Sequence, residues 1–255
     1  MSSTVLGNVI GVAGTAARTA VEAAVQIAAS RTGIDFGYLI AQARLESGLN
    51  PKAQSRSSSA AGLYQFTNAT WLETVRKHGA EHGLGWAANA LKDGAAALGH
   101  ETRTAILALR NDAQASALMA AEYAADNRDA LESRLGHAVG TTELYLAHFL
   151  GSSGAARFLK ANDSNAATSA AAVAPSAARS NRSIFFAADG RARSVGEVLQ
   201  RFADKLGTAT PTGKALPPAG TTLPVAGTTA AALTTRDLNQ RQLAAILAPR
   251  LDLQA

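Results

Sequence analysis

Residues 43–51, Ala-Arg-Leu-Glu-Ser-Gly-Leu-Asn-Pro, place a glutamate at a sharply marked helix end. Gly48 stands where a helix C-terminus favours a left-handed residue, and Pro51 follows where a helix cannot continue. The stretch therefore predicts a helix over about residues 36–47, capped at its start by Asp35, with Glu46 on its last turn.

Glu46 has a chemical reason for interest at this position. A carboxylate at a helix C-terminus faces the negative end of the macrodipole, which disfavours its ionised form, and burial against apolar neighbours acts in the same direction. A carboxylic acid that keeps its proton near neutral pH is what cleavage of a glycosidic bond requires. A glutamate near a helix end is also a common solvated surface residue, so the position alone leaves both interpretations open.

The rest of the chain predicts a mainly α fold. Hydrophobic residues make up 47% of the sequence and aromatic residues only 5%. Alanine-rich periodic segments without β-branched runs favour closely packed helices. Residues 52–62 are rich in Ser, Ala and Gly and are expected to form a loop. We expect another helical region to begin near Thr67, and further helices over about residues 15–32, 85–98, 101–127, 128–136, 141–150, 195–206 and 234–248.

Three stretches carry a resemblance to a known family. Residues 43–51 resemble the catalytic Glu-Ser motif of soluble lytic transglycosylase (SLT) domains, and residues 61–66, Ala-Gly-Leu-Tyr-Gln-Phe, resemble the Gly-Leu-Met-Gln motif of that family. Residues 145–151, Tyr-Leu-Ala-His-Phe-Leu-Gly, are similar to a looser variant of its Ala-Tyr-Asn-x-Gly segment. The resemblance covers roughly residues 20–160 and implies a lysozyme-like, mainly helical transglycosylase domain.

The resemblance also implies a reaction. Glu46 would protonate the oxygen between N-acetylmuramic acid and N-acetylglucosamine, and would then act as base on the sugar's own C6 hydroxyl to close a 1,6-anhydro ring. This reaction needs one carboxylate instead of the usual pair, and no Asp or Glu occurs between Glu46 and Glu73. The residues expected to bind the glycan are Ser47, Gly62, Leu63, Tyr64, Gln65 and Tyr145.

Each of these residues has an expected role at the site, and two of them, Ser47 and Tyr64, also have a purely structural interpretation. Ser47 would either help to hold the site or bond the helix backbone. Gly62 would permit close backbone approach to a sugar chain. Tyr64 and Gln65 would line the cleft, although Tyr64 replaces the usual Met of the family and, without the motif, would be a half-buried core aromatic. Tyr145 would hydrogen-bond Glu46 or the N-acetyl group.

Other candidate residues are given structural interpretations. His148 is expected to be a packed or capping histidine, and Trp71 a core residue, while Trp86 is a candidate for stacking on a sugar face. His78 and His82 have the i,i+4 spacing of a metal pair, but the His-Glu-x-x-His pattern is absent and we interpret them as surface histidines. Neither a metal nor an organic cofactor is expected.

Composition divides the chain into four segments. We expect an N-terminal segment at 1–19, the transglycosylase domain at 20–160, an Ala/Ser-rich linker at 161–183, and a largely disordered, low-complexity C-terminal region with two short helices at 184–255. Residues 1–160 hold 14 Lys and Arg against 13 Asp and Glu, whereas residues 161–255 hold 10 against 6. The basic C-terminal part suits an anionic polymer, or its arginines merely keep an alanine-rich segment soluble.

The expected partners are glycan strands of peptidoglycan and a protein bound through the C-terminal region, with no nucleic acid. We expect the periplasm or cell envelope as the location. No Lys or Arg precedes Arg18, so an N-terminal signal peptide is not evident and export would use another route, or the chain would begin upstream. Arg18 and Glu22 interrupt the one apolar stretch that approaches a membrane span.

Three alternatives remain open at this stage. A muramidase would hydrolyse the same bond with water, and a non-catalytic assembly protein would only dock on glycan. A wall-opening enzyme of a flagellum, secretion system or phage tail would use residues 161–255 for delivery.

Overall fold

The computed structural model describes the backbone from Ser3 to Ala209 and the side chains from residue 15 onward. Within this part of the chain, β structure is limited to four isolated bridges, so the predicted mainly α class is confirmed. The helices are α1 Ser3–Thr32, α2 Phe36–Ser47, α3 Asn68–His78, η1 Gly79–His82, α4 Gly85–Ala90, η2 Ala95–Ala97, α5 His100–Ala108, η3 Leu109–Asn111, α6 Ala113–Leu135, α7 Thr141–Asn165, α8 Ala170–Val173, α9 Pro175–Ser180, α10 Arg182–Phe185 and α11 Val195–Ala209.

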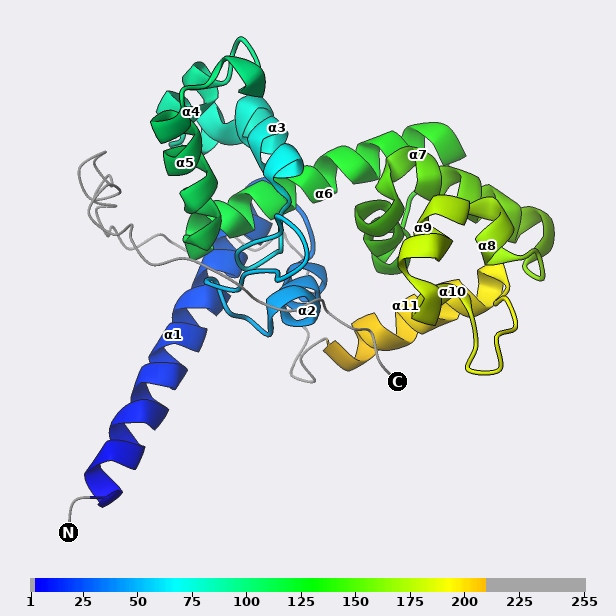
Figure 1. Ribbon diagram of the computed structural model, residues 1–255, viewed down its shortest axis with the longest axis horizontal. Helices are drawn as coiled ribbons and strands as arrows, with labels where there is room; N and C mark the ends of the chain where they lie inside the picture. The colour runs from blue at the N-terminus through cyan, green and yellow to red at the C-terminus, as the bar shows by residue number, and fades with distance from the viewer. Residues whose placement is uncertain (1–2, 210–255) are drawn as a thin grey trace.

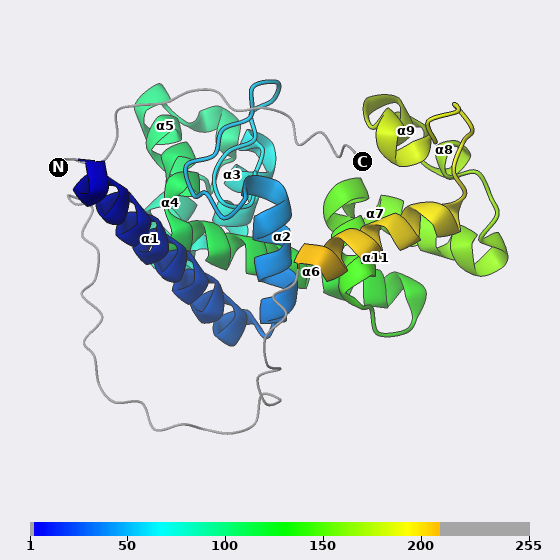
Figure 2. The same cartoon turned by 90° about the horizontal axis from the view of Figure 1, so that it is seen from below.

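The long helix α6 is the centre of the arrangement (Figure 1). Helix α1 runs along one part of α6, and α7 packs against another part. The elements α3, η1, α4 and α5 gather at one end of the molecule, and α7 to α10 gather at the other. Helix α2 contacts α1 on one side and α11 on the other (Figure 2), so it lies where the two ends meet.

The ends of α2 follow the predicted signals. Asp35 caps the start, because its side chain accepts a hydrogen bond of 2.7 Å from the backbone N–H of Tyr38. Gly48 ends the helix in the left-handed conformation at φ 62°, and its N–H donates to the carbonyl of Arg44. Thr67 caps the start of α3 in the same way, since its side chain accepts a hydrogen bond from the N–H of Thr70.

The prediction of one continuous helix over residues 101–127 is wrong. The chain breaks at Asp112, whose side chain accepts a 2.8 Å hydrogen bond from the N–H of Ala115 and so starts a new helix. That helix, α6, passes residue 128 without interruption and ends at Gly136 in the left-handed conformation. Gly94, at φ 90°, likewise divides the helix predicted over residues 85–98.

The predicted linker at residues 161–183 is wrong, because this segment is part of the packed structure. Helix α7, which kinks at Gly151, continues through residue 165 and is followed by α8, α9 and α10. Ala170 and Ala178 are buried, as are Ile184 and Phe185. Alanine forms helices readily, and its small side chain lets helices approach closely, so a composition that suggests a flexible linker here builds short packed helices.

The first of the two C-terminal helices predicted is confirmed as α11. Its apolar side, with Val195, Val198 and Phe202, is buried against α7 and α2. Arg44 of α2 donates a 2.9 Å hydrogen bond to the carbonyl of Ala209 at the end of α11. The second predicted helix, over residues 234–248, lies outside the described residues. None of the described helices is both long and apolar enough to cross a membrane.

Candidate active site

Glu46 lies on the last turn of α2, as predicted, and is mostly buried. The side chain is only 14% exposed, so it is largely withdrawn from water. The turn that follows is held by a hydrogen bond from the N–H of Leu49 to the carbonyl of Ala43, and Leu49 itself is buried. This closure fixes the direction in which the end of α2 presents Glu46.

Ser47 joins the end of α2 to the second motif. Its Oγ lies 2.8 Å from the carbonyl oxygen of Leu63 and 3.1 Å from that of Ala43. The two interpretations of Ser47 are therefore both found in one residue: the hydroxyl bonds its own helix, and it also tethers the turn formed by residues 61–66 beside Glu46.

Gly62 is required by a close approach within the protein. It has φ 81°, and a Cβ built at this position would lie 2.0 Å from the carbonyl oxygen of Arg110. The expected approach to a sugar chain is thus corrected, because the space in front of Gly62 is taken by the backbone of Arg110. The signal available in the sequence was the glycine alone, which does not reveal what approaches it.

Arg110 holds the turn of residues 61–66 through hydrogen bonds to backbone carbonyls, a role that was not predicted from the sequence. One terminal nitrogen of its guanidinium donates to the carbonyls of Ser59 (2.7 Å) and Phe66 (2.9 Å), and Nε donates to that of Leu107 (2.9 Å). Burial lowers the pKa of Arg110 to about 10. A single arginine in the sequence carries no mark of such a role, because its partners are backbone carbonyls.

Tyr64 and Leu63 do not line a cleft, which corrects the expectation for both residues. Both side chains are fully buried, and the hydroxyl of Tyr64 has no hydrogen-bond partner among the described residues. Burial raises the pKa of Tyr64 above its ordinary value. Leu63 and Tyr64 anchor the turn of residues 61–66 in the core. The Met that is usual in the family in place of Tyr64 would also fit there, because it is apolar.

Gln65 is the member of the second motif that remains partly exposed. It adopts φ 50°, and its Nε2 donates to the carbonyls of Gly62 (2.9 Å) and Ala53 (3.3 Å). The amide nitrogen is thus used within the turn, while Oε1 accepts no hydrogen bond from the described residues. Gln65 therefore offers a ligand one acceptor.

His148 lies beside the carboxylate of Glu46. Its Nε2 lies 3.3 Å from Oε1 of Glu46, and its side chain is 23% exposed. The ring lies beside two tyrosines, Tyr145 in a stacked arrangement at 6.0 Å and Tyr123 edge-on at 6.2 Å. His148 is therefore packed against two tyrosines, as predicted, and α7 also places it at the end of α2 beside Glu46.

Tyr145 lies beside this pair without a hydrogen bond to Glu46 in the structure as described. Burial, and to a lesser degree the Glu46 carboxylate, raise the pKa of Tyr145 above its ordinary value. Tyr38, about two turns before Glu46 on α2, has its pKa raised by burial, by Tyr145 and Tyr64, and by Glu46. Glu46 is the one carboxylate that acts on both of these phenols.

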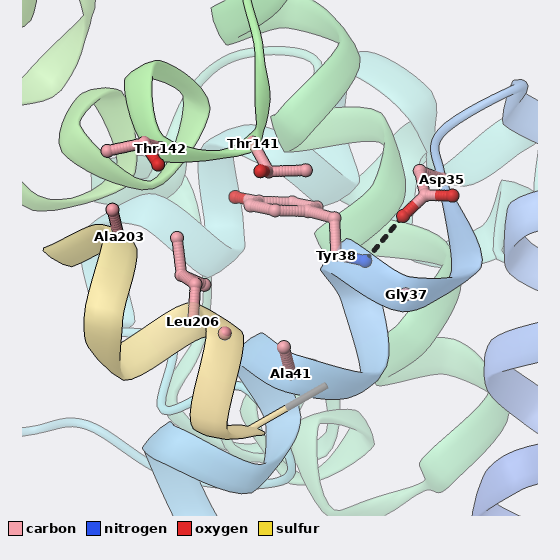
Figure 3. Close-up of a pocket in the computed structure, with 9 residues that line it drawn as sticks. Asp35, Gly37, Tyr38, Ala41, Thr141, Thr142, Ala203 and Leu206 are labelled. Carbon is pink, nitrogen blue, oxygen red and sulfur yellow. Dashed lines mark hydrogen bonds between the residues drawn. The ribbon is translucent and has the colours of Figure 1, made fainter. Parts of the chain in front are cut away.

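A shallow pocket lies at the opposite end of α2 (Figure 3). Its walls come from the first half of α2, the start of α7 and the last turns of α11, and the ring of Tyr38 points toward Thr141. None of the residues predicted to act on substrate lines this pocket. Tyr38 connects the two places, because it borders the pocket and also lies in the group of phenols around Glu46.

The two tryptophans differ in their surroundings. Trp71 is fully buried and its Nε1 donates a 2.8 Å hydrogen bond to the carbonyl of Ile106, which confirms its place in the core. Trp86 is partly buried, and its Nε1 has no hydrogen-bond partner among the described residues. Its role in sugar stacking remains a prediction.

A family model described as Transglycosylase SLT domain matches residues 23–103. The chain contains a transglycosylase SLT domain. The matched part of this SLT domain runs from α1 into α5 and includes Glu46, Ser47 and residues 62–65. Tyr145 and His148 lie beyond the match, so their position next to Glu46 is information that the fold adds. The SLT domain supports a lytic-transglycosylase-type activity on peptidoglycan.

Proposed function

We propose that this chain is a peptidoglycan lytic transglycosylase that cleaves the β-1,4 bond between N-acetylmuramic acid and N-acetylglucosamine, with Glu46 as its acid and base. The observation that carries the proposal is the isolation of this carboxylate at the end of α2. Its charge contributes to the raised pKa values of Tyr38 and Tyr145, and Nε2 of His148 lies 3.3 Å from its Oε1.

The reaction needs one proton donor that is regenerated. The proton of Glu46 passes to the bridging oxygen as the bond from that oxygen to C1 of the muramic acid breaks. The C6 hydroxyl oxygen of the same sugar then bonds to C1 and returns its proton to Glu46. No water is consumed, the product carries a 1,6-anhydro ring, and the carboxyl group ends in the form in which it began.

The surrounding residues act through position. His148 restrains the Glu46 carboxyl by the 3.3 Å contact, and Ser47 holds the turn of residues 61–66 against the end of α2. The free Oε1 of Gln65 accepts a hydrogen bond from a sugar hydroxyl or from the N–H of an N-acetyl group. Tyr145 shields the carboxyl from water on one side.

Hydrolysis by a muramidase commonly uses a second carboxylate, which activates water or stabilises the sugar cation. No second carboxylate contacts Glu46 or His148 in the described part of the chain. This arrangement favours transfer to the C6 hydroxyl over transfer to water.

The mass of the products tests the proposal directly. Purified peptidoglycan digested with the full chain is expected to release muropeptides that are lighter by one water than those released by a hydrolytic muramidase run in parallel. Products of the hydrolysed mass would establish the muramidase instead. If a control enzyme releases fragments and this chain releases none, the chain is a glycan-binding assembly protein.

We also propose that the enzyme acts in the periplasm or cell envelope as a local wall-opening enzyme, with a protein partner that binds C-terminal to the described helices. Residues 161–209 belong to the packed structure, so a deletion from residue 161 would remove Phe185 and Phe202 from the core. Deletion of residues 210–255 is the appropriate test. It is expected to abolish delivery in cells while sparing activity on isolated wall, and loss of activity on isolated wall would overturn the proposal.

A further inference from the structure

A second group of titratable side chains lies between the α3–η1 segment and α6. The interpretation of His78 and His82 as surface histidines is wrong, because their side chains are only 13% and 7% exposed. Each faces a carboxylate of α6. His78 and His82 form one i,i+4 pair, and Glu122 and Asp126 of α6 form another. The two pairs face each other where α3 and η1 pack on α6.

The ring of His78 is held at Nε2 by a carboxylate. Its Nε2 lies 3.0 Å from Oδ2 of Asp126, and Asp126 in turn accepts a 2.6 Å hydrogen bond from Nζ of Lys77. Donation from Nε2–H to Asp126 leaves the lone pair of Nδ1 pointing out of the ring on the other side. A carboxylate that fixes the tautomer of a histidine in this way is the usual outer partner of a metal-binding histidine.

Glu122 is oriented in the same manner. Its Oε1 lies 2.6 Å from Nε2 of His82, so the second oxygen, Oε2, is the one directed at His78. Oε2 lies 3.4 Å from Nδ1 of His78. Two ligand atoms bound to one tetrahedral zinc ion at 2.0–2.2 Å stand about 3.3 Å apart, so the observed separation is the one that a shared metal produces.

A third ligand is available from η1. One carboxylate oxygen of Glu81 lies within 4.8 Å of the ligand atoms of His78 and Glu122, and Glu81 is exposed, which leaves a side of the group open to solvent. One neutral imidazole and two carboxylates give a net charge of −2, which a divalent cation neutralises. Nitrogen and oxygen ligands of this kind suit Zn²⁺ better than Mg²⁺ or Ca²⁺, which prefer oxygen alone.

We propose that His78 (through Nδ1), Glu81 and Glu122 form a binding site for a zinc-type divalent transition-metal ion, with water as the remaining ligand. Asp126 and His82 are the positioning residues that orient His78 and Glu122. The ion joins the η1 turn to α6, and it lies outside the group of residues around Glu46. Its role is to hold these two elements together.

The alternative is a doubly protonated His78 between two carboxylates, with no metal. Metal binding by the full chain, freed of metal with a chelator and carrying no polyhistidine tag, separates the two. Calorimetric titration with Zn²⁺ alone is expected to show one saturable site, and Co²⁺ is expected to give a visible absorption spectrum typical of nitrogen and oxygen ligands. Binding at a free Zn²⁺ concentration 100 times Kd is expected to raise the thermal midpoint by about 5–10 °C.

Variants assign the site. His78→Ala is expected to abolish Zn²⁺ binding, and Asp126→Asn to weaken it about 10–100-fold, as loss of an outer partner does. Glu81→Gln provides a variant at an exposed position whose folding is not at risk, and it too is expected to weaken binding. His100→Ala, an exposed histidine at the start of α5, is the matched control and is expected to bind Zn²⁺ as the unaltered chain does.

Absence of saturable Zn²⁺ binding by the unaltered chain would overturn the proposal and leave the protonated His78 as the explanation. Binding that survives both His78→Ala and Glu81→Gln would place the metal elsewhere and would overturn it equally. Preference for Ca²⁺ over Zn²⁺ would contradict the proposed ligand chemistry.

Discussion

Replacement of Tyr64 by phenylalanine separates the structural account of the second motif from a substrate-binding one. The Tyr64 side chain is fully buried, and its hydroxyl has no hydrogen-bond partner among the described residues. A buried hydroxyl without a partner costs about 1–3 kcal/mol relative to its state in water. Tyr64→Phe removes that cost and leaves a space of only one oxygen atom, so we expect the free energy of unfolding to rise by about 1 kcal/mol.

For a protein of this size the change corresponds to an increase of about 2–4 °C in the thermal midpoint. The assay is thermal unfolding followed by circular dichroism, paired with muropeptide release from purified wall, which is expected to stay at the level of the unaltered enzyme. Tyr145→Phe is the matched control, because this tyrosine is also buried but lies beside Glu46. It is expected to lower muropeptide release, because it removes the hydroxyl that is predicted to hydrogen-bond the N-acetyl group of the glycan.

Two results would refute this reasoning. A fall of more than 1 kcal/mol in the stability of Tyr64→Phe would mean that the hydroxyl has a partner in the folded protein. A variant of unchanged stability that releases much less muropeptide would mean that the hydroxyl reaches the glycan.

Three other perturbations follow from the same structure. Gly62→Ala is expected to destabilise the protein by about 2–5 kcal/mol in urea unfolding, because the left-handed backbone is strained and the new Cβ meets the carbonyl of Arg110. Gly136→Ala is the control: it has φ 80° but open space around it, so it should cost only about 1–2 kcal/mol. Equal losses of stability in the two variants would contradict the close approach of Arg110 to Gly62. His148→Gln is expected to lower kcat about tenfold through the lost restraint on Glu46, with little change in KM or thermal midpoint, so a variant with unaltered kcat would remove His148 from the mechanism. The free energy of unfolding is expected to fall above about pH 10, because buried tyrosines whose pKa is raised in the folded state keep protons that the unfolded chain releases. Each such tyrosine lowers the free energy of unfolding by about 1.4 kcal/mol per pH unit, and a constant value between pH 9 and pH 11 would argue against their burial. The tyrosines concerned are Tyr38, Tyr64 and Tyr145.

The helix that carries Glu46 could be predicted because its signals are local. Asp35 and Gly48 act on backbone groups within a few residues, so the limits of α2 follow from the sequence alone. Asp112 is an equally local cap, but it stands within a continuous apolar pattern, and the periodicity hid the break between α5 and α6.

The surroundings of Glu46 could not be predicted in the same way. His148 lies 102 positions further along the chain, and nothing in its own neighbourhood indicates that α7 will place it 3.3 Å from the carboxylate. Arg110 forms its bonds with backbone carbonyls, which have no sequence signature. The motif at residues 61–66 correctly marked a structurally important turn, but residue type alone does not tell whether a motif residue faces a ligand or the core, as Tyr64 demonstrates.

The C-terminal helices illustrate a further limit. Residues 161–183 have the small, polar composition of a linker, and the same alanines that reduce hydrophobic signal allow helices to pack closely. Only α11, where Val195, Val198 and Phe202 recur at helical spacing, had a pattern strong enough to be predicted.

The most direct test of the central claim is muropeptide release by Glu46→Gln measured beside Glu73→Gln. Glu73 is the next carboxylate along the chain, and it lies on α3 in an exposed pair with Arg76. Glu46→Gln is expected to fold with an unchanged thermal midpoint and to release no anhydro muropeptides, while Glu73→Gln is expected to release them as the unaltered enzyme does. Anhydro muropeptides released by a folded Glu46→Gln variant would contradict the assignment of Glu46 as the acid and base.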